Sequence, residues 1–476
     1  MSIKGVIAVA AYVLLGAGFA AAGIVEEDSV KIRFHGYVGF ETEEIVAGRF
    51  RAASRAVVDH RWGGNTIGNL TADVTLNERA KALLTLEGRW WLGNFPQEFT
   101  TAVHQGLENY AAFYVYQAQG IYSILRDENR SLDFSFGIIP FKYNPEVKNL
   151  GEYLFRSMCY PGIIFSGFDF AQDRLSGLRL NYRQHTSLGD LTADAFILSE
   201  REIRPFGDIS FAGVVDFNFN KVVDFGLGAE LSHAISVNSR FTTPRADNTT
   251  LYAVGNPLYD SAGTTIIGYK DSSFYTFAGT KLMAHVTLDP LFFLRDSDFG
   301  RLLGEGGKIY GEAIILGLKN YPRNDSLRMP DGSISNGRNP YGYDTLMNKM
   351  PITFGINVPV PYLLDVCAVE FEYYQMRYPD NYTDVFENNR PLPYSYFTDL
   401  SVVGYPQNTY TKSDNWKWSI YMKKNITKNF HVVAQAARDH QRWSIPGFIW
   451  DKCSDWEDIC TRPSYWIWNL KGEVVF

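Results

Sequence analysis

The chain ends in Trp466-Ile467-Trp468-Asn469-Leu470-Lys471-Gly472-Glu473-Val474-Val475-Phe476, and this stretch decides the fold. Counting back from Phe476, every second residue is apolar or glycine, whereas the positions between them include Asn469, Lys471 and Glu473. A β-strand places alternate side chains on opposite faces, so one face of this stretch can contact lipid while the other contacts water. The pattern therefore predicts an amphipathic β-strand.

The same alternation recurs along the whole chain. It is clear in the first such segment, where Val30, Ile32 and Phe34 share one face and Lys31 and Arg33 share the other. We predict sixteen strands of this kind, at residues 30–42, 68–76, 80–91, 108–124, 131–142, 173–184, 189–199, 208–219, 222–234, 272–288, 306–318, 349–358, 363–377, 413–425, 428–440 and 464–476. No run of 18 apolar residues follows the N-terminal segment, so a transmembrane helix is not expected there.

The connections between these segments alternate between long and short. Short connections such as 77–79, 127–129 and 220–221 join most of every second pair of strands, and long ones join most of the others. The exceptions are a short connection near 200–207 and a longer one at 289–305. This arrangement predicts an all-β, transmembrane, antiparallel, up-and-down β-barrel of about 16 strands, with 14 and 18 as the alternatives. With the N-terminus in the periplasm, the short turns are periplasmic and the long loops are extracellular.

The N-terminal residues resemble an export signal rather than part of the fold. Lys4 precedes an apolar stretch at residues 5–19, and Ala20-Ala21-Ala22 provides small residues before Gly23. We expect residues 1–22 to be a signal peptide. A short transmembrane anchor is the alternative, but acidic residues follow directly. Residues 23–476 are then predicted to form a single barrel domain.

Composition excludes several classes of function. The chain is 46% hydrophobic and 15% aromatic with a net charge of −7, which argues against a disordered chain and against a nucleic-acid partner. No Ser/His/Asp set or metal-binding spacing is recognisable, so we expect no enzyme, no cofactor and no metal site. Cys453 and Cys460 lie in one long loop and could close a small disulfide ring.

The aromatic C-terminus resembles that of bacterial outer-membrane β-barrel proteins, whose last strand typically ends in Phe. The resemblance implies that Phe476 is an assembly signal read by the barrel assembly machinery. It implies a location in the cell outer membrane of a Gram-negative-type envelope, in contact with lipid and lipopolysaccharide. No specific family is assigned by this resemblance, although general porins are often homotrimers.

Strand alternation also assigns charges to the barrel interior. Two groups are predicted on opposite walls of a 16-stranded ring, where they would impose a transverse field on the lumen. The basic wall comprises Lys31, Arg33, Lys417, Lys423 and Lys471, and the acidic wall comprises Asp190, Asp194, Asp208, Asp216, Asp224 and Glu230. The alternative is that these charges are solvated or paired with neighbours.

The third long loop, residues 143–172, is the candidate for a pore constriction. Asn149 and Glu152 resemble a capping box, and Glu152 with Arg156 forms an i,i+4 pair, so a short helix is predicted. In general porins a third loop folds into the barrel and narrows it. By resemblance, the constriction would contain Lys142, Lys148, Glu152, Tyr153 and Arg156. A helix packed on the barrel rim is the alternative.

These features favour a porin-like channel for the passive diffusion of small hydrophilic solutes or ions. The alternative is a surface-binding barrel, an adhesin or a saccharide-binding protein, whose loops close the lumen. Aromatic residues such as Tyr394, Tyr396 and Trp443 in the late loops would suit sugar stacking.

Overall fold

The computed structural model describes residues 24–27, 30–48, 59–93, 109–155, 173–199, 207, 209–235, 253–259, 266–274, 279–294, 297–298, 306–315, 326–328, 334–336, 346–374, 415–438 and 464–476. The expected signal peptide at residues 1–22 lies outside these residues. Among the described residues, no helix is long and apolar enough to cross a membrane.

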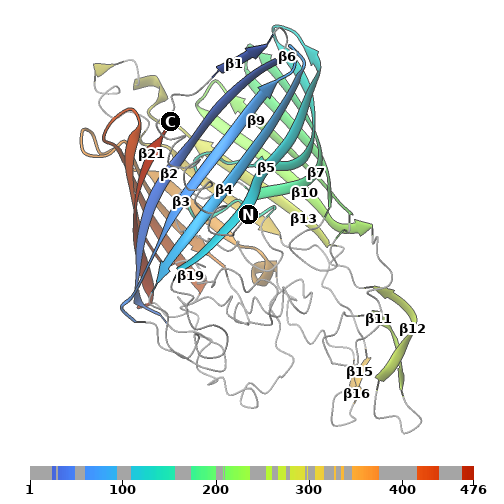
Figure 1. Ribbon diagram of the computed structural model, residues 1–476. Helices are drawn as coiled ribbons and strands as arrows, with labels where there is room; N and C mark the ends of the chain where they lie inside the picture. The colour runs from blue at the N-terminus through green and yellow to red at the C-terminus, as the bar shows by residue number, and fades with distance from the viewer. Residues whose placement is uncertain are drawn as a thin grey trace, which may run out of the picture.

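Sixteen antiparallel strands of the described part form one closed barrel (Figure 1). They are β2 (Val30–Ala47), β3 (Arg61–Thr75), β4 (Ala80–Gly93), β5 (Asn109–Arg126), β6 (Arg130–Phe141), β7 (Asp173–Thr186), β8 (Gly189–Ser199), β9 (Ile209–Phe219), β10 (Val223–Ile235), β13 (Gly279–Leu288), β14 (Ile309–Ile315), β17 (Ile352–Asn357), β18 (Val366–Tyr373), β19 (Trp416–Asn425), β20 (Phe430–Arg438) and β21 (Trp466–Val475). Each pairs with the next in this order, so the up-and-down topology is confirmed.

The barrel closes where its last strand pairs with its first. β21 and β2 are in antiparallel register from Tyr37 opposite Val475 to Ala47 opposite Trp466. Beyond β21, the Phe476 backbone N–H donates to the Gly36 carbonyl at 3.0 Å, and the Gly36 N–H donates to the Phe476 carbonyl at 3.1 Å. The short strand β1 (Ile24–Glu27) then pairs with the start of β2. The chain end that decides the fold therefore also closes it.

Smaller elements lie in the connections. Two hairpins, β11 (Ala253–Tyr259) with β12 (Ile266–Phe274) and β15 (Ser326–Arg328) with β16 (Ile334–Asn336), follow β10 and β14 at the long-loop end, at the bottom of Figure 1. Two short 3-10 turns occupy Phe292–Leu294 and Leu346–Lys349. The predicted strand at 272–288 began too early, because residues 272–274 belong to β12 and β13 starts at Gly279.

The short turns are stabilised by side chains that accept backbone hydrogen bonds. Asn77 Oδ1 accepts from the N–H groups of Arg79 and Ala80, both at 2.8 Å, and Asp127 Oδ1 accepts from Asn129 and Arg130 at 3.1 and 2.7 Å. Asn and Asp favour tight turns for this reason. A hydrogen bond from the Arg130 guanidinium also lowers the pKa of the Asp127 carboxyl below its usual value.

The barrel is apolar outside and polar inside. In β18, the outward Phe371 is 41% exposed, whereas its neighbours Glu370 and Glu372 are 1% and 0% exposed. In β21, Leu470 and Val474 are 43% and 49% exposed, and Lys471 lies buried between them. A water-soluble protein shows the reverse distribution, so this one matches a barrel whose outer surface faces lipid.

This parity predicts that an introduced arginine destabilises the barrel far more on the outer face than on the inner face. Leu86 in β4 is 50% exposed on the outer face, and Gln117 in β5 lies at a similar depth on the inner face, beside Thr85. We expect Leu86→Arg to cost about 2–4 kcal/mol of folding free energy in phospholipid vesicles. Gln117→Arg should stay within about 1 kcal/mol, the ordinary value of one hydrogen bond.

Urea titrations followed by the heat-modifiable mobility of the folded barrel measure both variants. Equal losses at the two positions would contradict the assignment of the outer face.

Candidate functional site

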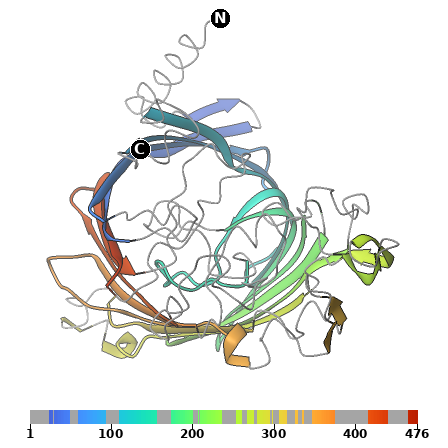
Figure 2. The ribbon, with the colours of Figure 1, turned by 90° about the horizontal axis from the view of Figure 1, so that it is seen from below.

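Residues 142–155, named here the inner segment, lie within the barrel (Figure 2). The segment leaves the end of β6, and its side chains and backbone bond to residues of β13, β14, β17 and β18. These strands lie well away from β6 in the strand order, so the chain crosses the lumen to reach them. Val147, Leu150 and Leu154 are 0–1% exposed, which shows that the segment is packed rather than loose.

Glu370 of β18 forms the central anchor. Its Oε1 accepts from the Lys148 N–H at 2.6 Å and from the Tyr310 hydroxyl at 2.8 Å. Its Oε2 accepts from the N–H groups of Asn149 and Leu150, both at 2.8 Å. A carboxylate offers about four lone-pair sites, so this one is fully used. It satisfies three successive backbone donors that have no helix or sheet to pair with.

Glu312 of β14 forms a second anchor a few residues further along the segment. Its Oε2 accepts from the Glu152 N–H at 2.8 Å, and its Oε1 accepts from the Tyr153 N–H at 2.9 Å and from the Tyr143 hydroxyl at 2.6 Å. Glu152 in turn accepts from the N–H groups of Tyr143 and Asn144. The two ends of the segment are therefore tied to each other and to the wall.

The last residues of the segment add side-chain contacts. The Tyr153 hydroxyl donates to Glu372 Oε2 at 2.7 Å and also contacts the Thr353 hydroxyl. The Leu154 carbonyl accepts from Lys281 Nζ at 2.7 Å, and Lys281 forms a salt bridge with Glu230 at 2.8 Å. All of these side chains are at least nine-tenths buried. Removing one member would leave another buried and unsatisfied.

At its middle, the segment reaches the short-turn end of the barrel. Glu146 accepts from Lys308 Nζ at 2.7 Å and from Asn357 Nδ2 at 2.5 Å. The two lysines of the segment bond within it, since Lys142 Nζ donates to the Val147 carbonyl at 2.6 Å and Lys148 Nζ to the Pro145 carbonyl at 3.1 Å. These hydrogen bonds within the segment stabilise its folded-back conformation.

The strand register explains why the anchors converge. Glu312, Thr353 and Glu372 are consecutive partners across β14, β17 and β18, and they form one lateral row on the inner face. In the next row Gly355 stands between Tyr310 and Glu370. A Cβ at Gly355 would lie 2.3 Å from the Tyr310 ring, so only glycine lets that ring cross to Glu370.

An uncharged polar surface lies on another part of the inner face. Thr71 of β3 and Thr85 of β4 share a hydrogen bond of 2.8 Å, Thr85 donates to Gln117 of β5 at 3.3 Å, and Gln117 donates to Gln119 at 2.9 Å. Hydroxyl and amide groups of this kind both donate and accept hydrogen bonds and carry no net charge.

The residues predicted for the constriction are all in the inner segment, except Arg156, which lies outside the described residues. Glu152 and Tyr153 are 0% and 1% exposed and bond to the wall rather than face open lumen. Lys142 and Lys148 are half-buried. The predicted short helix is wrong for residues 142–155, because the Asn149 N–H donates to Glu370 and Glu152 accepts from Tyr143 and Asn144 instead.

The predicted basic residues are interleaved with carboxylates. Lys471 forms a salt bridge with Glu473, which also contacts His431 at 2.5 Å. Lys417 is 2% exposed and stands opposite Glu372 in the register. Lys423 is half-buried, and Lys31 and Arg33 are exposed near the short-turn end of β2.

Most of the predicted acidic residues also have partners. Asp194 accepts from Arg179 at 2.7 Å, Glu230 pairs with Lys281, and Asp190 pairs with His185 at 2.5 Å. Asp216 contacts His285, and Asp224 accepts from Asn218. Asp208 lies outside the described residues. The strands that carry the two groups, β8–β10 on one side and β19, β21 and β2 on the other, lie on opposite arcs of the strand order, and the transverse field across the lumen stays a prediction.

Sequence reasoning missed the anchors Glu312, Glu370 and Glu372, and it missed Lys281. Each lies on the inner face of a strand that the alternation had already predicted, so parity alone could have placed them inside. Nothing local pointed to their partners, which are 127 to 222 residues away in the chain. Cys453 and Cys460 lie outside the described residues, and Cys367 of β18 is a free cysteine.

The chain matches no family model and no curated protein. Among solved structures, it is similar to a mutant of Rh. blastica porin, with 7% identity and a TM-score of 0.40 over 94% of this chain and 100% of that chain. It is also similar to Salmonella typhi OmpF in complex with daunomycin, with 8% identity and a TM-score of 0.45 over 95% of this chain and 100% of that chain.

Proposed function

We propose that this protein is a channel of the bacterial outer membrane, through which small hydrophilic solutes or ions diffuse passively beside the inner segment. The observation that carries the proposal is the inner segment itself, which the wall carboxylates Glu312 and Glu370 hold across a closed barrel. The apolar outer face supports the location in lipid, and the polar inner face supports a hydrated passage.

A polar lumen that is partly filled by an anchored segment would admit solutes according to their size. A barrel of about sixteen strands is too wide for its own side chains to fill. The inner segment then sets the width that remains, while the threonines and glutamines of β3, β4 and β5 line the passage without a fixed charge.

The basic test is electrical. We expect the purified barrel, reconstituted in a planar lipid bilayer, to give discrete conductance steps and to admit small sugars in a vesicle-swelling assay. A correctly folded barrel that gives neither conductance nor swelling would contradict the proposal and would favour the surface-binding alternative.

Loss of an anchor should widen the passage. In Glu370→Gln, the amide presents a donor where a backbone N–H now finds an acceptor, and each unsatisfied buried group costs about 1–3 kcal/mol. We expect a higher single-channel conductance, together with faster hydrogen exchange at the amides of Lys148, Asn149 and Leu150, which donate to Glu370.

Asp133→Asn is the matched control. Asp133 is a carboxylate of β6 whose bond, from the Ser123 hydroxyl at 2.6 Å, joins two wall strands rather than the inner segment. It should leave both readouts unchanged. Exchange that accelerates in Glu370→Gln without a change in conductance would show that the segment does not limit the passage.

The charge of the segment should set ion selectivity. Lys148 is half-buried, and its ammonium bonds only to a carbonyl of the same segment among the contacts described, so Lys148→Ala removes a positive charge without breaking an anchor. We expect the permeability ratio to shift toward cations at 0.01 M salt, where the Debye length is about 30 Å, and much less at 1 M, where it is about 3 Å.

Reversal potentials measured at both salt concentrations provide this readout. Lys221→Ala, at the exposed turn between β9 and β10, is the control and should leave the ratio unchanged. An equal shift in both variants would mean that the charge acts from the barrel mouth.

A further inference from the structure

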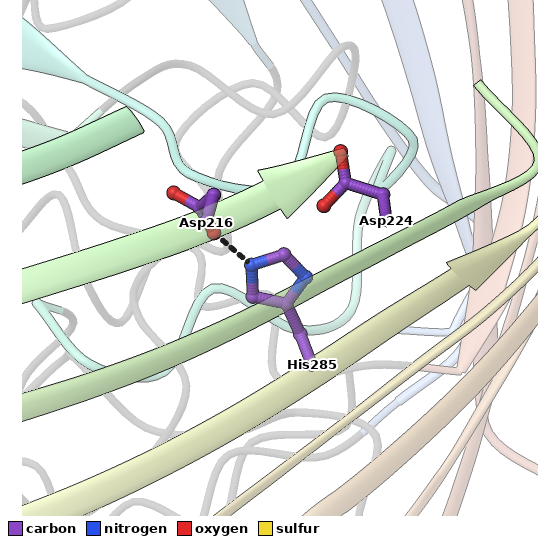
Figure 3. Close-up of side chains that lie close together, drawn as sticks. All are labelled: Asp216, Asp224 and His285. Atoms are coloured by element: carbon purple, nitrogen blue, oxygen red, sulfur yellow. Dashed lines mark hydrogen bonds and ion pairs between the residues drawn. The ribbon is translucent and has the colours of Figure 1, made fainter. Parts of the chain in front are cut away.

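Three side chains of the ligand type converge on the inner face of β9, β10 and β13. Asp216, Asp224 and His285 each offer one atom, and these atoms all lie within 4.8 Å of one another (Figure 3). The three residues come from neighbouring strands whose backbones are hydrogen-bonded together. The group is therefore held by the barrel wall and not by a loop.

A glycine makes the convergence sterically feasible. Gly226 of β10 is the register partner of Asp216 on one side and of His285 on the other. A Cβ at this position would lie 2.1 Å from both Asp216 Oδ1 and His285 Nε2. The carboxylate and the imidazole thus meet directly over the glycine, and Asp224 lies two residues before it on the same face.

The electrostatic balance of the group is incomplete. His285 Nε2 contacts Asp216 Oδ1 at 2.7 Å, and Asn218 Nδ2 donates to Asp224 Oδ2 at 3.0 Å, which orients the second carboxylate. Within the described part of the chain, neither carboxylate forms a salt bridge with a lysine or arginine. His285 is 3% exposed, and its Nδ1 has no hydrogen-bond partner among the described residues. Two carboxylates therefore lie close to one imidazole, and only Asp216 is hydrogen-bonded to it.

We infer that Asp216, Asp224 and His285 form a binding site for a divalent transition-metal cation of the Zn²⁺ class. One imidazole nitrogen with two carboxylate oxygens is a donor set that zinc accepts, whereas Ca²⁺ and Mg²⁺ prefer oxygen ligands alone. The cation takes the place of the contact between Asp216 and His285. Because the Asp216 side chain is 18% exposed, water from the lumen can complete the coordination.

The site adjoins the inner segment, so it goes beyond passive diffusion. The Tyr143 ring stacks on the His285 ring with centroids 5.6 Å apart, and the Tyr143 hydroxyl donates to the anchor Glu312. A bound cation adds positive charge to the wall beside the segment. The channel would then respond to a trace metal at concentrations at which bulk ions have no effect.

The test is a calorimetric titration of the folded barrel with Zn²⁺, in detergent and without an affinity tag. We expect one site in the unmodified protein. We expect Asp224→Asn and His285→Gln each to weaken zinc binding by about tenfold or more. Even the loss of a residue that only hydrogen-bonds a metal ligand typically lowers metal affinity by about 10–100-fold. A large excess of Ca²⁺ should not displace the zinc.

His185→Gln is the matched control, because His185 also contacts an aspartate, Asp190, at 2.5 Å but is 68% exposed at a turn. It should leave the affinity unchanged. Heat-modifiable mobility verifies that each variant is folded. If His285→Gln does not fold, Asp224→Asn provides the test alone, because an asparagine there still accepts the hydrogen bond from Asn218. Absence of binding in the unmodified protein, or unchanged binding in a folded Asp224→Asn variant, overturns the inference. Conductance recorded without zinc tests the channel separately.

Discussion

The acceptance of three backbone N–H groups by the Glu370 carboxylate is the interaction on which the interior depends. A buried stretch of chain that is neither helix nor strand must find acceptors for its amides, and inside the barrel Glu370 and Glu312 provide them. Charge-assisted hydrogen bonds of this kind are about twice as strong as neutral ones. The carboxylates thereby take the role that a ladder of backbone carbonyls has elsewhere.

This arrangement also resolves an electrostatic difficulty. Several buried carboxylates lie within one wall, and burial of an unpaired charge is costly. Here the carboxylates that bond to the inner segment or lie beside it face amide dipoles, tyrosine hydroxyls or a lysine such as Lys281 or Lys308. The inner segment and the wall therefore stabilise each other, since neither the free amides nor the free carboxylates could remain buried alone.

The strands could be predicted from the sequence because their signal is local. Alternation around Leu470 and Lys471, tight turns at Asn77 and Asp127, and the rhythm of loop lengths are all visible within a few residues, and all sixteen predicted strands correspond to strands of the barrel. The errors lie where the partner is remote. Asn149 and Glu152 have the spacing of a capping box, yet each finds its bonds elsewhere, Asn149 at a residue 221 positions away. His285 could not be predicted as a site residue for the same reason, because its aspartates are on other strands.

The position of the anchors in the chain bears on how the barrel assembles. Every described anchor of the inner segment belongs to a strand between β10 and β18, whereas the seam lies between β2 and β21. The segment can therefore dock while the sheet is still open. Its burial then stabilises the partly paired sheet and offsets the cost of pairing strands that are far apart in the chain, which makes such topologies slow to fold. A segment already bound to an open sheet also imposes curvature on it, since β6 and β18 are joined across the inner side. The seam between β2 and β21 can then close after the segment has docked, with the inner segment already in place.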